Sequence, residues 1–193
     1  MTAKRVLISY GSRYGATEDT SRNIARILET DNDFGTEILD LRKTKENAWP
    51  SIEGYDGIII GSGVRVTRWT KESTKFLRKC KEAFEKNKKV LGFFISCGYS
   101  ADPKYYPIAR KDFLEKKFEK IGIKPDLYDA FGGIFDFSES TILGYIDRKI
   151  LTLGASDLSI DINYNERNDY RNWNQIRDFC KAFAELILSQ ARQ

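Results

Sequence analysis

Residues 5–28 read RVLISYGSRYGATEDTSRNIARIL, and the rest of the chain can be interpreted outward from them. The apolar run at 6–8 has the length and composition of a buried strand. Apolar residues then recur at helical spacing, at Ile24, Ala25, Ile27 and Leu28. A strand that turns directly into a helix leaves the first N–H groups of that helix unpaired, at the positive end of its dipole. Segment 9–17 is therefore a candidate phosphate-binding turn, the alternative being a corner that is merely rich in serine and glycine.

The exact amino-acid sequence of this turn limits which phosphate-containing ligand it can be expected to bind. It contains neither the G-x-G-x-x-G of dinucleotide folds nor the G-x-x-x-x-G-K-[ST] of nucleoside triphosphatases. The run Tyr10-Gly11-Ser12-x-x-Gly15-x-Thr17-Glu18 instead resembles the phosphate loop of flavodoxins, which holds the monophosphate of FMN. The resemblance implies FMN as the cofactor, its phosphate held by Ser12, Arg13, Tyr14, Gly15, Ala16 and Thr17.

The composition is ordinary for a globular protein. The chain has 193 residues, 41% of them hydrophobic, and is most simply one domain spanning 1–193. It contains no histidine, and its three cysteines form no C-x-x-C pair, which excludes imidazole catalysis and leaves no metal site to expect.

Charge and hydropathy bound the partners and the location. A net charge of +4 suits an anionic substrate or an anionic membrane surface, or reflects a solvated surface alone, and no nucleic-acid partner is expected. The chain enters a strand at once and has no apolar run of membrane-spanning length, which favours a cytoplasmic location.

Strands and helices alternate along the chain. Apolar runs predict further strands at 36–41, 57–61, 90–96 and 127–135, the last bent at Gly132-Gly133. Helical spacing predicts helices within 70–89 and 107–121 and from Trp173 to about residue 187, with Asn172 as the N-cap of the last. This alternation predicts an α/β fold, a doubly wound five-stranded parallel sheet with helices on both faces. The flavodoxin-like strand order would be 2-1-3-4-5, with the ligand beyond the carboxyl ends of the strands.

Two loops should then face the flavin ring. The first, 61–69, reads GSGVRVTRW, and its residues Ser62, Gly63, Val64 and Arg65 are expected beside the ring. Arg65 can stack on a flat ligand, stabilise a reduced flavin or bind a carboxylate, or it can form an ordinary surface ion pair. The second loop, 96–102, reads SCGYSAD and contributes Ser96, Cys97, Gly98 and Tyr99. Without a neighbouring base, Cys97 is expected to be a packing thiol, and Trp69 and Tyr14 are expected to pack.

A more specific resemblance extends over nearly the whole chain. Gly61-x-x-Val64-Arg65, Asp147-Arg148, a turn at 154–157 and Trp173 before NQIRDF are similar to menaquinone-dependent protoporphyrinogen IX dehydrogenases. That branch of the flavodoxin superfamily often has histidine where this chain has Trp69-Thr70. The resemblance implies protoporphyrinogen oxidation with a quinone as acceptor, and a rim of Arg65, Arg68 and Arg110 would receive the substrate's propionates.

Segment 136–171 is expected to be an insert in this domain. Its part 140–153 has an apolar stripe (Ile142, Leu143, Ile146, Ile150 and Leu153) opposite Arg148 and Lys149, which is typical of an amphipathic helix. Such a helix can cap the flavin, pair with a second subunit, rest on the inner face of a membrane, or pack on its own domain. The run at 161–171, DINYNERNDYR, predicts a solvated, mobile loop.

Four functions remain open at the level of the sequence. The leading hypothesis is an FMN-dependent oxidoreductase that oxidises protoporphyrinogen IX or a similar reduced substrate. The others are a flavodoxin-type electron carrier, which is usually more acidic than this chain, an NAD(P)H:quinone reductase of the same fold, and a domain that has lost its flavin.

Overall fold

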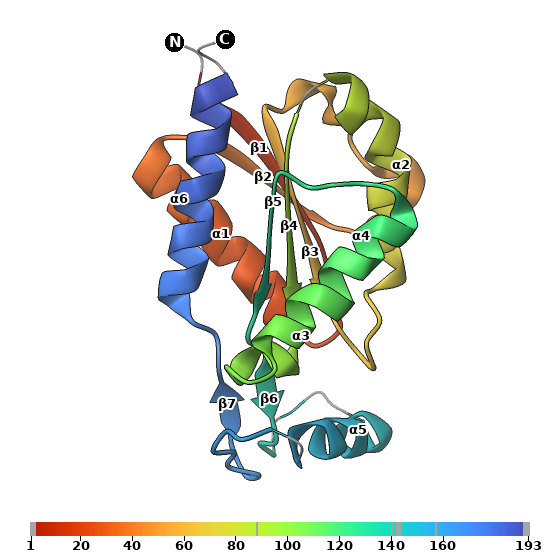
Figure 1. Cartoon of the computed structure of the whole chain (residues 1–193), viewed down its shortest axis with the longest axis vertical. Helices are drawn as coiled ribbons and strands as arrows, with labels where there is room; N and C mark the ends of the chain where they lie inside the picture. Colours follow the sequence, from red (N-terminus) through yellow and green to blue (C-terminus); the bar gives the residue numbers. More distant parts are fainter. Residues whose placement is uncertain (1–2, 88, 140, 142–143, 157, 191–193) are drawn as a thin grey trace.

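The computed structural model describes residues 3–87, 89–139, 141, 144–156 and 158–190, and within them five parallel strands form the central sheet (Figure 1). In spatial order these are β2 (Gly35–Asp40), β1 (Arg5–Gly11), β3 (Gly57–Gly63), β4 (Val90–Ser96) and β5 (Leu127–Phe131). The strand order is 2-1-3-4-5, so the predicted α/β fold class is confirmed.

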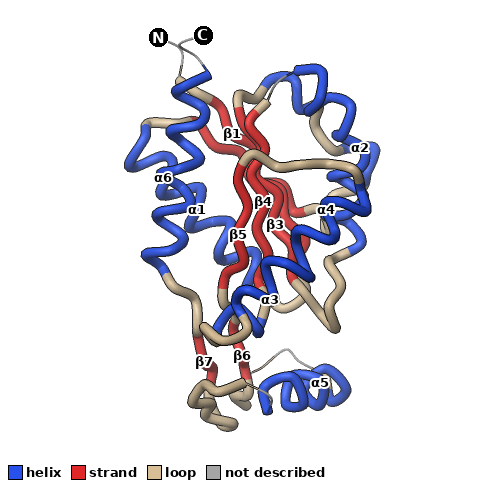
Figure 2. Tube along the Cα trace, in the orientation of Figure 1, coloured by secondary structure: helices blue, strands red, loops and turns tan. Residues whose placement is uncertain are grey.

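Helices cover both faces of the sheet (Figure 2). On one face lie α1 (Ala16–Asn32) and α6 (Trp173–Gln190). On the other lie α2 (Lys71–Asn87) and a helical run composed of α3 (Tyr106–Arg110), a π-helical turn (Lys111–Glu115) and α4 (Lys116–Ile121). Asn172 caps α6 as predicted, because its Oδ1 accepts from the N–H groups of Asn174 and Gln175 at 3.0 and 3.2 Å.

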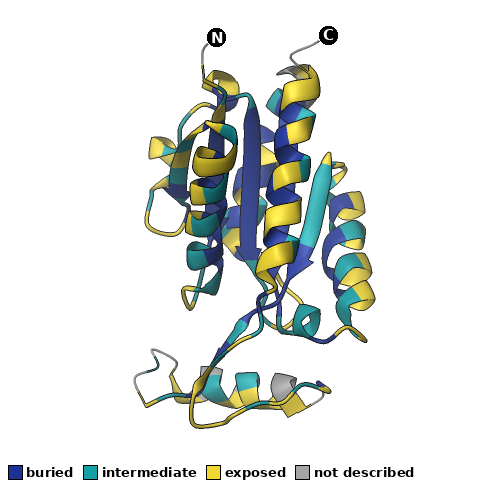
Figure 3. Cartoon of the chain, turned by 90° about the vertical axis from the view of Figure 1, so that its left-hand side faces the viewer, coloured by how far each residue is buried: buried dark blue, intermediate teal, exposed yellow. Residues whose placement is uncertain are grey.

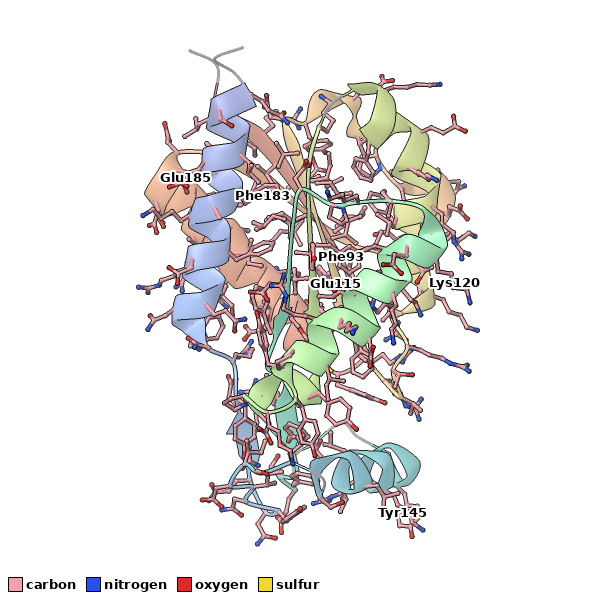
Figure 4. The ribbon with its side chains drawn as sticks, in the orientation of Figure 1. Phe93, Glu115, Lys120, Tyr145, Phe183 and Glu185 are labelled. Carbon is pink, nitrogen blue, oxygen red and sulfur yellow. The ribbon has the colours of Figure 1, made fainter. Side chains whose placement is uncertain are left out.

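The inner strands are continuously apolar because both of their faces are buried. Consecutive residues point to opposite sides, so Phe93 packs beneath α2 and α4 while Phe94 packs beneath α1 and α6. On the α6 side Phe183 reaches the sheet (Figure 4), and a Cβ at Gly92 would lie 2.9 Å from its ring. Gly92 therefore keeps α6 close to β4.

The predicted strand at 127–135 is broken in the structure. β5 ends at Phe131, and a second strand, β6 (Ile134–Asp136), leaves the sheet after Gly132-Gly133. A Cβ at Gly132 would collide with the carbonyl oxygen of Tyr170, so the glycine permits a close passage of two backbones.

β6 pairs antiparallel with β7 (Arg167–Asp169), forming a two-stranded sheet separate from the main one. The prediction of a mobile loop over 161–171 is therefore wrong at its end, where β7 and the buried Arg171 are ordered by pairing and by ion pairs. Polar strands of three residues carry too little alternation to be recognised in a sequence.

α5 (Tyr145–Ser156) and the β6–β7 pair lie beyond the carboxyl end of the main sheet (Figures 1 and 3). Phe135, Phe137 and Leu158 form a small core there, and Leu151 of α5 packs against it. The helix continues to Ser156 where a turn at 154–157 was expected, and the predicted positions Ser140, Ile142, Leu143 and Asp157 lie outside the described residues. Among the helices described here, none is long and apolar enough to cross a membrane.

Candidate functional site

A cavity of about 480 Å³ opens at the carboxyl ends of β1, β3 and β4, the place where sheets of this order bind ligands. All of the predicted cofactor residues except Gly15 and Ser62 line this cavity. They are Ser12, Arg13, Tyr14, Ala16, Thr17, Gly63, Val64, Arg65, Ser96, Cys97, Gly98 and Tyr99. The three predicted loops thus meet around one space.

The turn between β1 and α1 presents backbone donors without a side-chain cap. Gly15 is the N-cap of α1 with a φ of +89°, a conformation that other residues rarely adopt. Its N–H donates to Ser12 Oγ at 3.0 Å, and the first intrahelical bond runs from Asp19 N–H to the Gly15 carbonyl. The N–H groups of residues 16–18 precede that bond, so they and the helix dipole can bind an anion.

Cations offset the two carboxylates in the first turn of α1. Arg22 and Lys43 reach Glu18 at 3.0 and 3.6 Å, and Arg171 reaches Asp19 at 2.6 Å. These pairs reduce the repulsion that an incoming phosphate would meet.

Arg42 does not line the cavity but contacts the phosphate turn, and this contact was not predicted from the sequence. It follows β2, and its Nη1 donates to the carbonyl oxygen of Ser12 at 2.7 Å. The bond holds that carbonyl toward Arg42 and brings a positive charge to the phosphate turn. The sequence did hold one indication of this contact. Arg42 comes just after β2, and neighbouring parallel strands such as β1 and β2 end at the same edge of a sheet.

In the loop after β3 (61–69), the first of the two loops expected beside the ring, Ser62 points away from the cavity and holds the loop in place. Its side chain is buried, and Ser62 Oγ accepts from the N–H of Thr70 at 3.0 Å. Gly63 is the residue that comes close to the phosphate turn, since a Cβ there would lie 3.2 Å from Thr17 Oγ1. Gly63 therefore lines the cavity, whereas the Ser62 hydroxyl does not.

The same loop ends in a tight turn over 65–68. The backbone N–H groups of Arg65 and Arg68 donate to each other's carbonyls at 3.0 and 3.1 Å. Between them Val66 and Thr67 have φ of +47° and +60°, unfavourable values for β-branched residues. This turn forms part of the cavity wall.

Trp69 packs, as expected. Its ring stacks on Phe93 with centroids 4.4 Å apart, and its Nε1 donates to the carbonyl of Phe113 at 2.7 Å. Tyr14 lines the cavity and is 39% exposed, so it lies outside the buried core that holds Trp69.

The second ring loop is tied to the first by a bond from Val64 N–H to the Ser96 carbonyl at 3.0 Å. Ser96 Oγ is buried without a hydrogen-bond partner among the described residues. Burial raises the pKa of Cys97 to about 11, so its thiol stays protonated at neutral pH, consistent with a packing role. The Tyr99 ring is held between Tyr105 and Phe113 at centroid distances of 5.1 and 5.7 Å.

The far wall of the cavity was not predicted residue by residue. It comes from Phe113 and from the region after β5, with Ile134, Phe135, Asp136, Thr141, Leu151, Leu153 and Arg167. The sequence feature that indicated this wall was the amphipathic pattern at 140–153, because a helix with that pattern can cap the flavin.

Arg110 does not join Arg65 at the cavity. Its Nη1 lies 3.1 Å from Asp129 Oδ1, and its guanidinium lies 4.7 Å from the centroid of the Tyr128 ring. The expectation of a rim containing Arg110 is therefore wrong. The described residues also contain no group of three or more Cys, Asp or Glu that could hold a metal ion.

Comparison with known proteins accords with this geometry. Residues 7–153 match the family model described as "Flavodoxin domain". The chain belongs to the flavodoxin-domain family. No curated protein sequence matches it.

Solved structures share the fold of this flavodoxin-domain chain at low sequence identity. The rubredoxin oxygen:oxidoreductase of Desulfovibrio gigas is 14% identical with a TM-score of 0.56, covering 98% of this chain and 37% of that one. The Flv1 flavodiiron core of Synechocystis sp. PCC6803 is 18% identical with a TM-score of 0.52. The match covers 95% of this chain and 37% of that one. The chain thus spans 37% of the length of these two structures. A Fusobacterium nucleatum flavodoxin variant bound to flavin mononucleotide is 15% identical, with a TM-score of 0.47 and 97% of each chain covered.

FMN is the cofactor that accompanies this family, and the residues present fit it. The uncapped start of α1 suits a phosphate, and the unpartnered Ser96 Oγ is a hydrogen-bonding group at the edge of the cavity. The chain is a flavin redox protein.

Proposed function

We propose that the chain is an FMN-dependent oxidoreductase with a substrate of its own. In this proposal residues 12–17 hold the phosphate, and the ring lies between loops 62–65 and 96–99. When bound, FMN supplies an acceptor for two electrons and a proton. The protein residues orient the ring, restrict water and recognise the substrate.

The observation that carries this proposal is the far wall of the cavity. A carrier needs its ring near solvent, whereas here Phe135, Leu151 and Leu153 add an apolar wall beyond the two ring loops. Arg65 and Arg167 supply guanidinium groups from opposite walls of the same space. An apolar space with a few cationic groups suits a flat, hydrophobic substrate that carries acidic substituents.

A reduced tetrapyrrole such as protoporphyrinogen IX has this chemistry, with a quinone as the electron acceptor. The resemblance of Gly61-x-x-Val64-Arg65 to that branch supports the choice. We propose Arg65 as the residue that receives a carboxylate, and segment 136–171 as an insert of the same domain that closes the substrate side. The exposed Tyr145, which does not line the cavity, is the side chain that peripheral contact with a membrane, or pairing in a homodimer, would use. A cytoplasmic location also remains a prediction.

An electron carrier is the second candidate, because the family itself favours it. Anaerobic reductive titration of the purified, FMN-loaded protein separates the two. Uptake of both electrons in one step supports the oxidoreductase, and two well-separated steps support the carrier.

Substitution of Arg65 tests the substrate side. In Arg65→Ala, the KM for an anionic tetrapyrrole should rise about tenfold or more, from loss of a charge-assisted bond, while the Kd for FMN changes little. The matched control is Arg68→Ala in the same turn, because Arg68, although expected in the rim, is not among the residues that line the cavity. This control should leave that KM within about twofold. Equal weakening of FMN and substrate in Arg65→Ala would contradict the assignment.

A further inference from the structure

α2, α4 and the 65–68 turn carry a cluster of cationic side chains outside the cavity. We call Arg68, Arg78, Lys117 and Lys120 the basic face. Arg68, Arg78 and Lys120 are exposed, and Lys117 is half-buried. Figure 4 shows Lys120 pointing away from α4 into solvent.

These residues come from three separate segments that the fold brings together. Lys81 of α2 donates to the carbonyl of Ile121 at 3.5 Å, so α2 and the end of α4 are in contact. Lys117 Nζ lies 5.7 Å from the ring centroid of Trp69, which follows Arg68. Burial, and then repulsion from Lys120, Arg68 and Arg78, lowers the pKa of Lys117, as expected when all four charges share one surface.

The basic face is not compensated within its own helices. In the part of the chain that the structure describes, none of its four members forms a salt bridge. Among the nearby carboxylates, Asp112 pairs with Lys116 at 2.7 Å and Glu115 accepts from the Tyr128 hydroxyl at 3.0 Å. Glu119 lies next to Lys120 in the chain and forms no salt bridge with the four cations in the described structure. Like charges held together cost stability, so such a cluster is better explained by an anionic partner than by folding.

The basic face lies next to the opening of the cavity. Arg68 and Arg65 exchange backbone hydrogen bonds, and Arg65 lines the cavity wall. We propose that this face docks an acidic protein, which would then sit beside the mouth of the cavity. The inference goes beyond the proposed function, because docking requires neither FMN nor a particular substrate.

A protein fits this face better than a lipid surface or a nucleic acid does. Of the exposed large hydrophobic residues described, none lies on α2 or α4 and one, Val66, lies on the 65–68 turn, whereas a membrane-bound helix directs a whole apolar side outward. The apolar residues of both helices are buried against the sheet. Glu72 and Glu119 interrupt the cations along these helices, a pattern that suits spaced carboxylates better than a continuous row of phosphates.

The test uses an acidic plant-type ferredoxin as the probe, with binding measured by calorimetry on the whole chain, with and without FMN. Three exposed members are reversed together, as Arg68→Glu, Arg78→Glu and Lys120→Glu, leaving Lys117 over Trp69. The matched control reverses three exposed cations on α1 and α6, as Arg26→Glu, Arg177→Glu and Lys181→Glu. Both variants have the same net charge, so only the position of the change differs.

We expect the wild-type chain to bind the ferredoxin at low salt, and to bind it more weakly between about 20 and 200 mM salt. The basic-face variant should raise the Kd about tenfold or more, and the control variant less than about threefold. Thermal melting and FMN content identify a variant that has not folded. In that case Arg78→Gln with Lys120→Gln replaces it, with Arg177→Gln and Lys181→Gln as the control.

Three results would overturn the proposal. The first is no binding of ferredoxin by the wild-type chain at low salt, and the second is equal loss of affinity in both variants. The third is tighter, basic-face-dependent binding to phosphatidylserine vesicles or to a DNA duplex than to the ferredoxin. Vesicles would indicate a membrane surface, and the duplex would indicate a nucleic-acid site.

Discussion

At the scale of single residues, Gly15 is the position on which the phosphate turn depends. Its φ of +89° places the following N–H groups at the cavity, and a Cβ added there would meet nothing within 4 Å. Any cost of adding a side chain is therefore a cost of backbone conformation alone.

Gly15→Ala should lower the free energy of unfolding by about 1 kcal/mol and weaken FMN binding, because alanine disfavours a positive φ. Gly144→Ala is the matched control, since Gly144 also has open space around its Cβ position and no positive φ. Urea unfolding and FMN fluorescence titration measure the two effects. Equal behaviour of the two variants would show that the turn does not need the left-handed conformation.

The three cysteines make a second prediction, on pH. Burial raises the pKa of Cys80 and Cys97 from 9.0 to about 11 and that of Cys180 to about 12. The thiols ionise at lower pH in the unfolded chain than in the folded one, so the stability that they contribute is complete below pH 9. It is lost as pH rises from 9 to about 11 for Cys80 and Cys97, and to about 12 for Cys180. The free energy of unfolding should fall by up to about 1.4 kcal/mol per pH unit for each thiol.

Urea unfolding between pH 7 and 10.5 measures this slope. Cys180→Ala should have a shallower slope than the wild-type chain even though its stability at pH 7 is lower. A slope unchanged by the substitution would rule out the thiol as its source.

At the scale of elements, Arg171 joins the β7–α6 connection to the start of α1. Its side chain is 3% exposed, with Nη1 2.6 Å from Asp19 and Nη2 2.5 Å from Asp169. The guanidinium also lies 4.5 Å from the centroid of the Trp173 ring. The β6–β7 segment and the first turn of α1 therefore share one buried cation.

Arg171→Ala should destabilise the protein by about 2 kcal/mol, less than for fully buried pairs because both carboxylates are partly solvated. Arg177→Ala, an exposed residue of α6, should change stability by less than about 0.5 kcal/mol. Denaturant unfolding measures both. If Arg171→Ala unfolds like the control, the connection is held by β6–β7 pairing alone.

The 65–68 turn has the geometry of a type I′ hairpin but lacks the residues that favour it. Replacing Val66 and Thr67 together, as Val66→Asn with Thr67→Gly, should raise the free energy of unfolding by about 1–2 kcal/mol, because both φ values are then favourable. Thermal melting provides the comparison, with Val66→Ala as a control that keeps the strain. A lower melting temperature in the double variant would mean that the β-branched side chains stabilise the turn.

The limits of prediction from the sequence lie at this scale. Buried strands and amphipathic helices were recognisable because their apolar periodicity is local. β7 was missed because three polar residues carry no such pattern. The contacts of Arg42 with Ser12 and of Arg171 with Asp19 join residues far apart in the chain, so only the folded structure shows them.

At the scale of the whole molecule, the layered core and the cavity have separate origins. The core forms where the sheet and its helices bury their apolar side chains against each other. The cavity forms from loops at the carboxyl ends of the strands. Twelve of the fourteen predicted cofactor residues line it because neighbouring parallel strands end at one edge. The far wall depends on the packing of α5 and β6–β7, which the strand order does not determine.

The most direct test of FMN binding at this edge is an amide NMR titration of the labelled protein with FMN, and in parallel with riboflavin, which lacks the phosphate. We expect FMN to shift the amides of 12–17, 62–65 and 96–99, and riboflavin, where it binds, to leave those of 12–17 in place. Shifts confined to other surfaces, or equal shifts of 12–17 with both ligands, would contradict the assignment of the β1–α1 turn as the phosphate site.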